Sequence, residues 1–120
     1  MKVIKAADRL GGDSKPPTGK FHGRALQRPL LETEEESRVS FVRFELGAHN
    51  HWHTHSGGQL IHVVEGHARV QPWGEEVHSL SEGDTAICPP GEKHWHGAGA
   101  DGPMTHLVAS LGAIEWLEEV

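Results

Sequence analysis

The sequence contains few of the features that mark secreted or membrane-spanning proteins. Cys88 is the one cysteine among 120 residues, so an internal disulfide framework is excluded and nothing indicates secretion. No apolar run approaches the roughly 20 residues needed to cross a bilayer, and residues 1–10 lack the apolar core of a signal peptide. We therefore expect a cytoplasmic protein that does not enter a membrane. No base lies beside Cys88 in the sequence, so we interpret it as a small packed residue.

Positive charge is also scarce. Lys and Arg number 11 against 17 Asp and Glu, which gives a formal net charge of −6. This balance argues against nucleic acid and anionic membranes as partners, and favours a small-molecule substrate. Glycine and histidine, by contrast, are abundant, at 15 and 11 residues. The histidines are scattered along the chain, unlike a purification tag, and they carry the functional argument.

The spacing of turn residues predicts one all-β domain over residues 21–120. Short runs rich in β-formers alternate with Gly- and Pro-containing turns, as in a sandwich or barrel. We expect strands at 21–30, 38–46, 50–55, 59–64, 67–73, 76–80, 84–88, 94–96 and 104–110. Residues 113–120 are compatible with a short helix or a final strand. Residues 1–20 are rich in Lys, Gly, Pro and Asp and predict a flexible N-terminal arm, and the acidic run 32–36 predicts a solvated hairpin tip.

Strand parity gathers histidines on one face. Residues two apart in a strand share a face, so His51, His53 and His55 align, and a Ser-Gly-Gly turn returns Gln59 beside them. The same parity pairs residues in three other runs: Ser40 with Val42, His94 with His96, and His106 with Ser110. If these faces point into one barrel, its interior is an apolar pocket with imidazoles along part of the wall.

So many buried imidazoles require a partner. Neutral rings need hydrogen bonds, charged rings repel one another, and a divalent metal resolves both problems by accepting the lone pairs of neutral rings. Histidines outside these runs or facing away from them are interpreted as surface residues: His22, His49, His62, His67 and His78. For His51 we also favour a surface position.

Two spaced motifs carry a family resemblance. The first has Gly47, His53, His55, Gln59 and Gly66, and the second runs from Gly83 through a Pro-Pro-Gly turn ending at Gly91 to His94. Both resemble the motifs of the cupin superfamily, which implies a jelly-roll, or double-stranded β-helix, barrel. The resemblance implies a metal site formed by His53, His55, Gln59 and His94, with the four motif glycines at turns. Gln59 stands where the family has Glu, and Ala98 where it has Asn.

The Gln at position 59 matters for charge. It is a neutral oxygen donor, so three His and one Gln leave a formal charge of +2 on a divalent ion, which makes the ion a stronger Lewis acid. Mixed nitrogen and oxygen donors suit Mn²⁺, Fe²⁺, Ni²⁺ or Zn²⁺. Because metal binding requires neutral imidazoles, we expect metal to be lost as the pH falls well below about 6.5.

A closer resemblance covers residues 47–120. This stretch is similar to small single-domain cupins that include carboxymuconolactone-decarboxylase-like proteins and manganese-dependent hydroxynitrile lyases. It implies Mn²⁺ as the metal, and His96 and His106 as catalytic histidines that do not bind it. In such a lyase one of them takes the substrate hydroxyl proton, and the C–C bond to cyanide breaks. The expected substrate pocket contains Val42 with Ser40, and Asn50 and Ser110 in place of a Thr and a Gln.

Two other functions remain open from the sequence. One is different metal-dependent chemistry on a small oxygenated compound, by a dioxygenase, isomerase or decarboxylase. The other is a non-catalytic cupin that binds a small molecule.

Trp52 and Trp95 have the opposite parity from the ligands and should lie outside the barrel wall, under a second sheet or a partner subunit. They favour a homo-oligomer, either a dimer or a tetramer.

Overall fold

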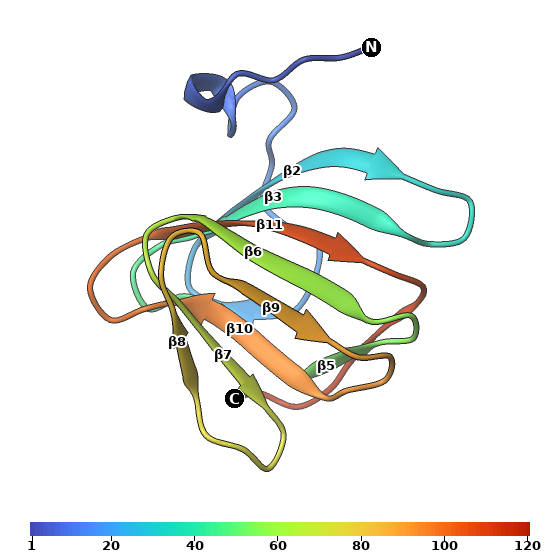
Figure 1. The fold of residues 1–120 in the computed structure, drawn as a ribbon, viewed down its shortest axis with the longest axis vertical. Coiled ribbons are helices and arrows are strands. Elements are labelled where there is room, and N and C mark those ends of the chain that lie inside the picture. Colours follow the sequence, from blue (N-terminus) through green and yellow to red (C-terminus); the bar gives the residue numbers. More distant parts are fainter.

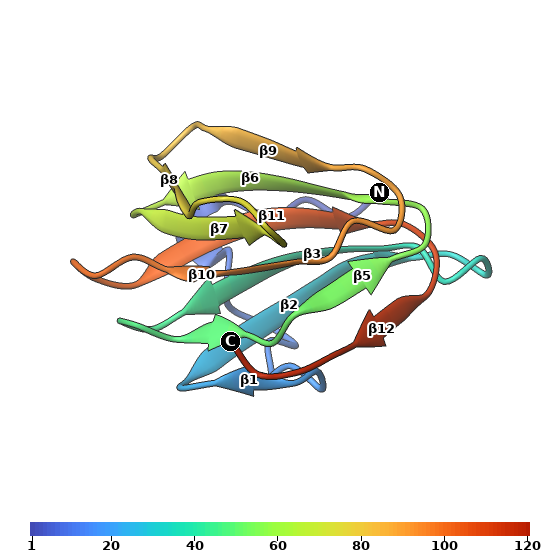
Figure 2. The ribbon, with the colours of Figure 1, turned by 90° about the horizontal axis from the view of Figure 1, so that it is seen from below.

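Two antiparallel sheets form the molecule. The computed structural model describes residues 1–120. One sheet has five strands in the spatial order β2 (Ala25–Glu32), β3 (Arg38–Phe44), β11 (Met104–Ser110), β6 (Gln59–Glu65) and β9 (Thr85–Cys88). The other has the order β1 (Phe21–His22), β4 (His49–Asn50), β10 (His94–Ala98), β5 (His53–His55) and β12 (Ile114–Trp116), and β7 (Ala68–Pro72) joins β10 to β8 (His78–Leu80). The sheets curl around one interior (Figures 1 and 2), which confirms the all-β barrel.

Alternation along the strands builds the core. Strand β3 buries Ser40, Val42 and Phe44 and turns the residues between them outward. Strand β6 alternates in the same way, with Ile61 and Val63 fully buried, and β11 alternates from His106 onward. Alternate side chains of a strand point to opposite faces, so a polar residue at an inward position necessarily joins this interior.

Cross-strand register gives the barrel an apolar end and a polar end. At the apolar end, Phe44 of β3 lies opposite Met104 of β11. At the polar end, Ser110 of β11 lies between Arg38 of β3 and Gln59 of β6. The strands are therefore aligned so that their inward polar residues collect at one end, where the histidine strand β5 also lies.

Most expected strands are present, but two of them are interrupted. Residues 21–30 divide at Gly23, where φ is +90° and an added Cβ would lie 2.7 Å from the Ala48 Cβ. Residues 50–55 divide because the His51 N–H donates to Lys20 and the Trp52 N–H to Glu118, outside the β4 and β5 pairings. At the C-terminus a strand forms rather than a helix: β12 pairs with β5, beside which it lies in Figure 2. The motif glycines all have positive φ, as expected of turn positions: Gly47, Gly66, Gly83 and Gly91.

The N-terminal arm is tied to the first sheet. Figure 1 shows the start of the arm above β2, with one 3-10 turn, η1 (Ala6–Asp8), before the chain descends behind the sheet. Arg28 of β2 donates to the Asp8 carbonyl over 2.7 Å and pairs with Asp13. Lys15 forms a β-bridge to Gln27, and Pro17, Thr18 and Gly19 continue to the barrel opening. The acidic residues after β2 form the expected turn before β3.

The outward tryptophans are covered within the chain. The Trp52 ring contacts the Trp73 ring at a centroid distance of 4.9 Å, and the Lys93 ammonium lies over both rings. Trp95 lies beneath the Arg69 guanidinium and donates its Nε1–H to Gln71 over 2.7 Å. Neither residue needs a partner subunit for its burial, so the homo-oligomer stays a prediction.

The structure contains no helix with the length and hydropathy of a membrane span.

Candidate metal centre

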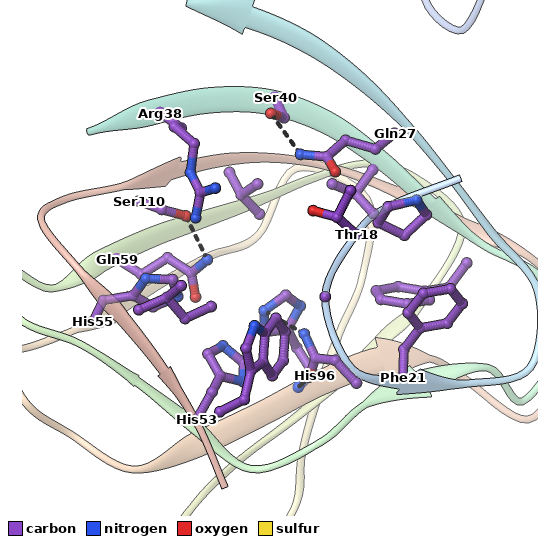
Figure 3. Close-up of a pocket in the computed structure, with 18 residues that line it drawn as sticks. Thr18, Phe21, Gln27, Arg38, Ser40, His53, His55, Gln59, His96 and Ser110 are labelled. Carbon is purple, nitrogen blue, oxygen red and sulfur yellow. Dashed lines mark hydrogen bonds between the residues drawn. The ribbon is translucent and has the colours of Figure 1, made fainter. Parts of the chain in front are cut away.

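Four donor side chains converge at the polar end of the barrel. His53 and His55 come from β5, Gln59 begins β6 and His94 begins β10, and all four are at least 95% buried. The His53 ring centroid lies 4.5 Å from that of His94 and 5.0 Å from that of His55. Figure 3 shows His53, His55 and Gln59 around the same space. The four ligands implied by the family resemblance are therefore brought together.

Backbone carbonyls fix the orientation of two of these rings. The Nδ1–H of His53 donates to the His51 carbonyl over 2.8 Å, and that of His94 to the Glu92 carbonyl over 3.0 Å. A carbonyl oxygen can only accept, so in each neutral ring the proton is on Nδ1 and Nε2 carries a lone pair. Histidines that bind metals are usually held by this kind of second hydrogen bond.

In the absence of a cation, the lone pairs of these donor atoms have no favourable partner. Gln59 donates its Nε2–H to Ser110 Oγ over 2.9 Å, which leaves Oε1 facing His94 Nε2 at 2.9 Å. Both of these atoms carry lone pairs and no hydrogen, so they repel unless a cation lies beside them. Both ring nitrogens of His55 are buried without a hydrogen-bond partner. Three imidazole nitrogens and one amide oxygen thus fit a divalent metal ion.

His96 lies next to these donors but is already fully hydrogen-bonded. Its ligand atom is within 4.8 Å of those of His53 and His94. Asn50 Nδ2 donates to His96 Nε2 over 3.1 Å, and Asn50 Oδ1 accepts from the His96 backbone N–H over 2.9 Å. With Nε2 engaged in this way, His96 fits the expected role of a histidine that does not bind the metal.

A directional hydrogen-bond chain continues from His96 to His106. His106 Nδ1–H donates to the Val42 carbonyl over 2.9 Å, so His106 Nε2 is an acceptor. His96 Nδ1–H donates to that nitrogen over 2.8 Å. His96 lines the cavity, whereas His106 is completely buried behind it. Any proton that His106 exchanges with the cavity therefore passes through His96.

Burial keeps these imidazoles neutral. Burial first, and the nearby His94 second, lower the pKa of His53 to about 3 and that of His55 to about 4. Burial also lowers the pKa of His106 to about 4 and that of His96 well below its usual value. At neutral pH the rings are consequently in the form that binds metal and accepts protons.

A cavity of about 220 Å³ opens beside the donors. All four expected pocket residues line it: Ser40, Val42, Asn50 and Ser110. The sequence interpretation missed several others, among them Thr18, Gln27 and Arg38. Parity could have found Arg38, because it shares a face with Ser40 and Val42. No sequence pattern marks Thr18, which reaches the cavity from the arm.

The remaining histidines lie outside the cavity. His51 lies 4.0 Å from Glu119, and parity alone misplaces it because the chain leaves the strand pairing between β4 and β5. The others are exposed or half-buried: His22, His49, His62, His67 and His78. Cys88 is buried, and burial raises the pKa of its thiol to about 12, which agrees with a packing residue.

Comparison with known proteins shows the family of this chain. The family model described as Cupin domain matches residues 40–110. The chain belongs to the cupin family. This cupin is 35% identical to an (R)-mandelonitrile lyase of Granulicella tundricola over 100% of this chain and 95% of that protein.

Solved structures support the same assignment. A cupin-like protein of Thermotoga maritima superposes with a TM-score of 0.80 at 33% identity, over 88% of each chain. A cupin 2 conserved barrel domain protein of Rhodopseudomonas palustris gives a TM-score of 0.75 at 16% identity, over 96% of this chain and 82% of that one. The second likeness concerns the fold alone.

Proposed function

We propose that this cupin is a metal-dependent lyase that splits a 2-hydroxynitrile into cyanide and a carbonyl compound. The observation that carries the proposal is the hydrogen-bond chain from His96 through His106 to the Val42 carbonyl, directly beside the metal donors. The similarity to a mandelonitrile lyase along the whole chain supports the same reaction. A divalent ion held by His53, His55, Gln59 and His94 would lower the pKa of a substrate hydroxyl.

The chain's own residues provide the proton path. His96 faces the cavity and accepts the hydroxyl proton at Nε2, where the substrate hydroxyl replaces the Asn50 amide as hydrogen-bond donor, while its Nδ1–H passes to His106 Nε2. The oxygen electron pair forms the new C=O bond, and cyanide leaves with the electrons of the broken C–C bond. His106, whose pKa is about 4, readily returns the proton through His96, and cyanide departs as HCN.

Other residues position His96 and the substrate. Asn50 contacts both the side chain and the backbone N–H of His96, which fixes the ring at the cavity wall. Val42 and Val108 provide an apolar surface for the organic part of the substrate. The fixed imidazole and the apolar wall exclude water from the bond that breaks.

The test is mandelonitrile cleavage by the Mn²⁺-loaded protein, followed by benzaldehyde absorbance. We expect release above the buffer rate, and a loss of about 100-fold or more in His106→Ala, since a general base contributes roughly 10²- to 10⁴-fold. His78→Ala, at an exposed position, is the matched control. Loading with Fe²⁺, Ni²⁺ or Zn²⁺ tests our choice of Mn²⁺.

Two results would reject parts of the proposal. A wild-type rate equal to buffer with every metal rejects the lyase assignment. An active wild type whose rate is unchanged in His106→Ala rejects the proton path. Metal content and the thermal unfolding midpoint are measured for each variant, so that a lost site is distinguished from a lost base.

A further inference from the structure

The cavity has one charged side chain, and that charge is positive. Among its 18 lining residues are no Asp, Glu or Lys, and Arg38 is the only Arg. The metal donors are neutral as well, because His53, His55 and His94 are uncharged at neutral pH and Gln59 is an amide. A chain with a formal net charge of −6 therefore encloses a cavity without any negative side chain.

Register places Arg38 across the cavity from the metal donors. Arg38 lies opposite Ser110, and Ser110 lies opposite Gln59, so the three share one row of the inner face. Neighbouring strands are about 4.8 Å apart, which puts the Arg38 backbone roughly 10 Å from that of Gln59. Figure 3 shows the Arg38 side chain directed into the cavity near Ser110. A small ligand can therefore contact Arg38 and the metal donors together.

The guanidinium of Arg38 has no partner in the protein. It forms neither an ion pair nor a side-chain hydrogen bond, although Glu32 faces it in the β2–β3 register. Three other arginines of the barrel are engaged: Arg28 with Asp13, Arg43 with Glu45, and Arg69 with the Ala98 carbonyl. A guanidinium does not lose its proton in proteins, so the half-buried Arg38 keeps an unmatched charge.

The lining of the cavity also places this charge near the donors. Arg38 lines the same cavity as His53, His55 and Gln59. Arg38 is thus part of the same site rather than a surface residue at its rim.

We propose that Arg38 binds the carboxylate of the substrate while the reacting oxygen faces the four metal donors. The planar fork of a guanidinium matches the two oxygens of a carboxylate, whereas cyanide offers it a single acceptor atom. This inference rests on the proposed function and narrows its substrate to a small 2-hydroxynitrile that also carries a carboxylate, for which a 2-hydroxy acid is a binding probe. The cavity volume of about 220 Å³ limits the size of that substrate.

The test compares mandelate with its neutral isostere mandelamide. Dissociation constants are measured by titration calorimetry for the full chain, both Mn²⁺-loaded and metal-free. We expect Arg38→Gln to weaken mandelate binding by roughly tenfold to a hundredfold, the size of a hydrogen-bonded charge contact, and to leave mandelamide unchanged. Arg38→Lys should retain part of the preference. Arg43→Gln, on the outer face of the same strand, is the matched control and should bind like wild type.

The outcomes separate this inference from the proposed reaction. Equal mandelate binding by wild type and Arg38→Gln overturns the inference, whatever the result with mandelonitrile. A carboxylate preference that depends on Arg38, in a protein that releases no cyanide, supports the inference and rejects the lyase reaction. Unchanged unfolding midpoints and metal content in Arg38→Lys show that the site is intact in the comparison.

Discussion

His55 is the candidate metal ligand whose ring nitrogens lack hydrogen-bond partners. Both of its ring nitrogens are buried without a partner, and a buried polar group left without a hydrogen bond costs about 1–3 kcal/mol. Neighbouring His53 and His94 have their Nδ1–H groups bonded to carbonyls and only Nε2 is free. A metal ion shared by these rings supplies the missing partner, so His55 is the most direct place to test the site.

We expect His55→Leu to remove the response to metal. In wild type, metal at 100 times its dissociation constant should stabilise the fold by about 2.7 kcal/mol, whereas the variant should gain little. In chelator the variant should be at least as stable as wild type, because an apolar residue replaces an imidazole without partners. Thermal unfolding with Mn²⁺ and with chelator measures both effects. A variant that is still stabilised by Mn²⁺ like wild type contradicts the site, and His78→Leu is the exposed control.

Single residues also show how far the sequence predicts the site. The resemblance to the cupin motifs implies His53, His55, Gln59 and His94 as metal donors, and the structure brings these four side chains together. The direction of the Gln59 amide could not be predicted, since it depends on Ser110, which is 51 positions away.

Strand β10 connects the proposed metal donors to the proposed proton path. All five of its residues are buried, and it pairs with β4, β5 and β7. His94 therefore lies opposite His53, while His96 reaches Asn50 of β4. One buried strand thus contributes a residue to each of the two groups.

We expect Gly97→Ala to separate β4 from β10. An added Cβ would collide with the His49 side chain and lie 2.5 Å from the Ala48 carbonyl oxygen. The clash should destabilise the fold by about 1–3 kcal/mol, as overpacking usually does. Denaturant unfolding measures the change, and Gly102→Ala is the control, because nothing lies within 4 Å of its added Cβ. Equal stability of Gly97→Ala and wild type would show that β4 moves without cost.

At the scale of the whole molecule, buried neutral histidines link stability to pH. The pKa of His106 is about 4 in the folded chain, against about 6.5 when unfolded, so the unfolded chain binds more protons between these values. The stability from neutral burial is present above about pH 6.5 and is lost as the pH falls toward 4. His53, with a pKa of about 3, and His55, with one of about 4, act in the same direction.

We expect the metal-free protein to become less stable from pH 7 to pH 4. His106 alone should contribute a loss of about 3 kcal/mol, from a difference of roughly 2.5 pKa units. Urea unfolding in chelator at several pH values measures it, and constant stability from pH 7 to pH 5 contradicts it.

Because the ligand pKa values are low, protons should displace metal nearer pH 4 than pH 6.5, which metal analysis after dialysis can check.

The sequence by itself determined the all-β barrel and the turn glycines, and its resemblance to the cupin motifs implied the four candidate metal donors. The barrel and the turns follow from local rules, because strand parity and positive φ depend on residues close together in the chain. Only the tertiary structure decided that the His96 and His106 hydrogen bonds run toward the Val42 carbonyl and that Arg38 faces the cavity without a partner. These features depend on the register between strands distant in sequence, which packing of the whole barrel sets.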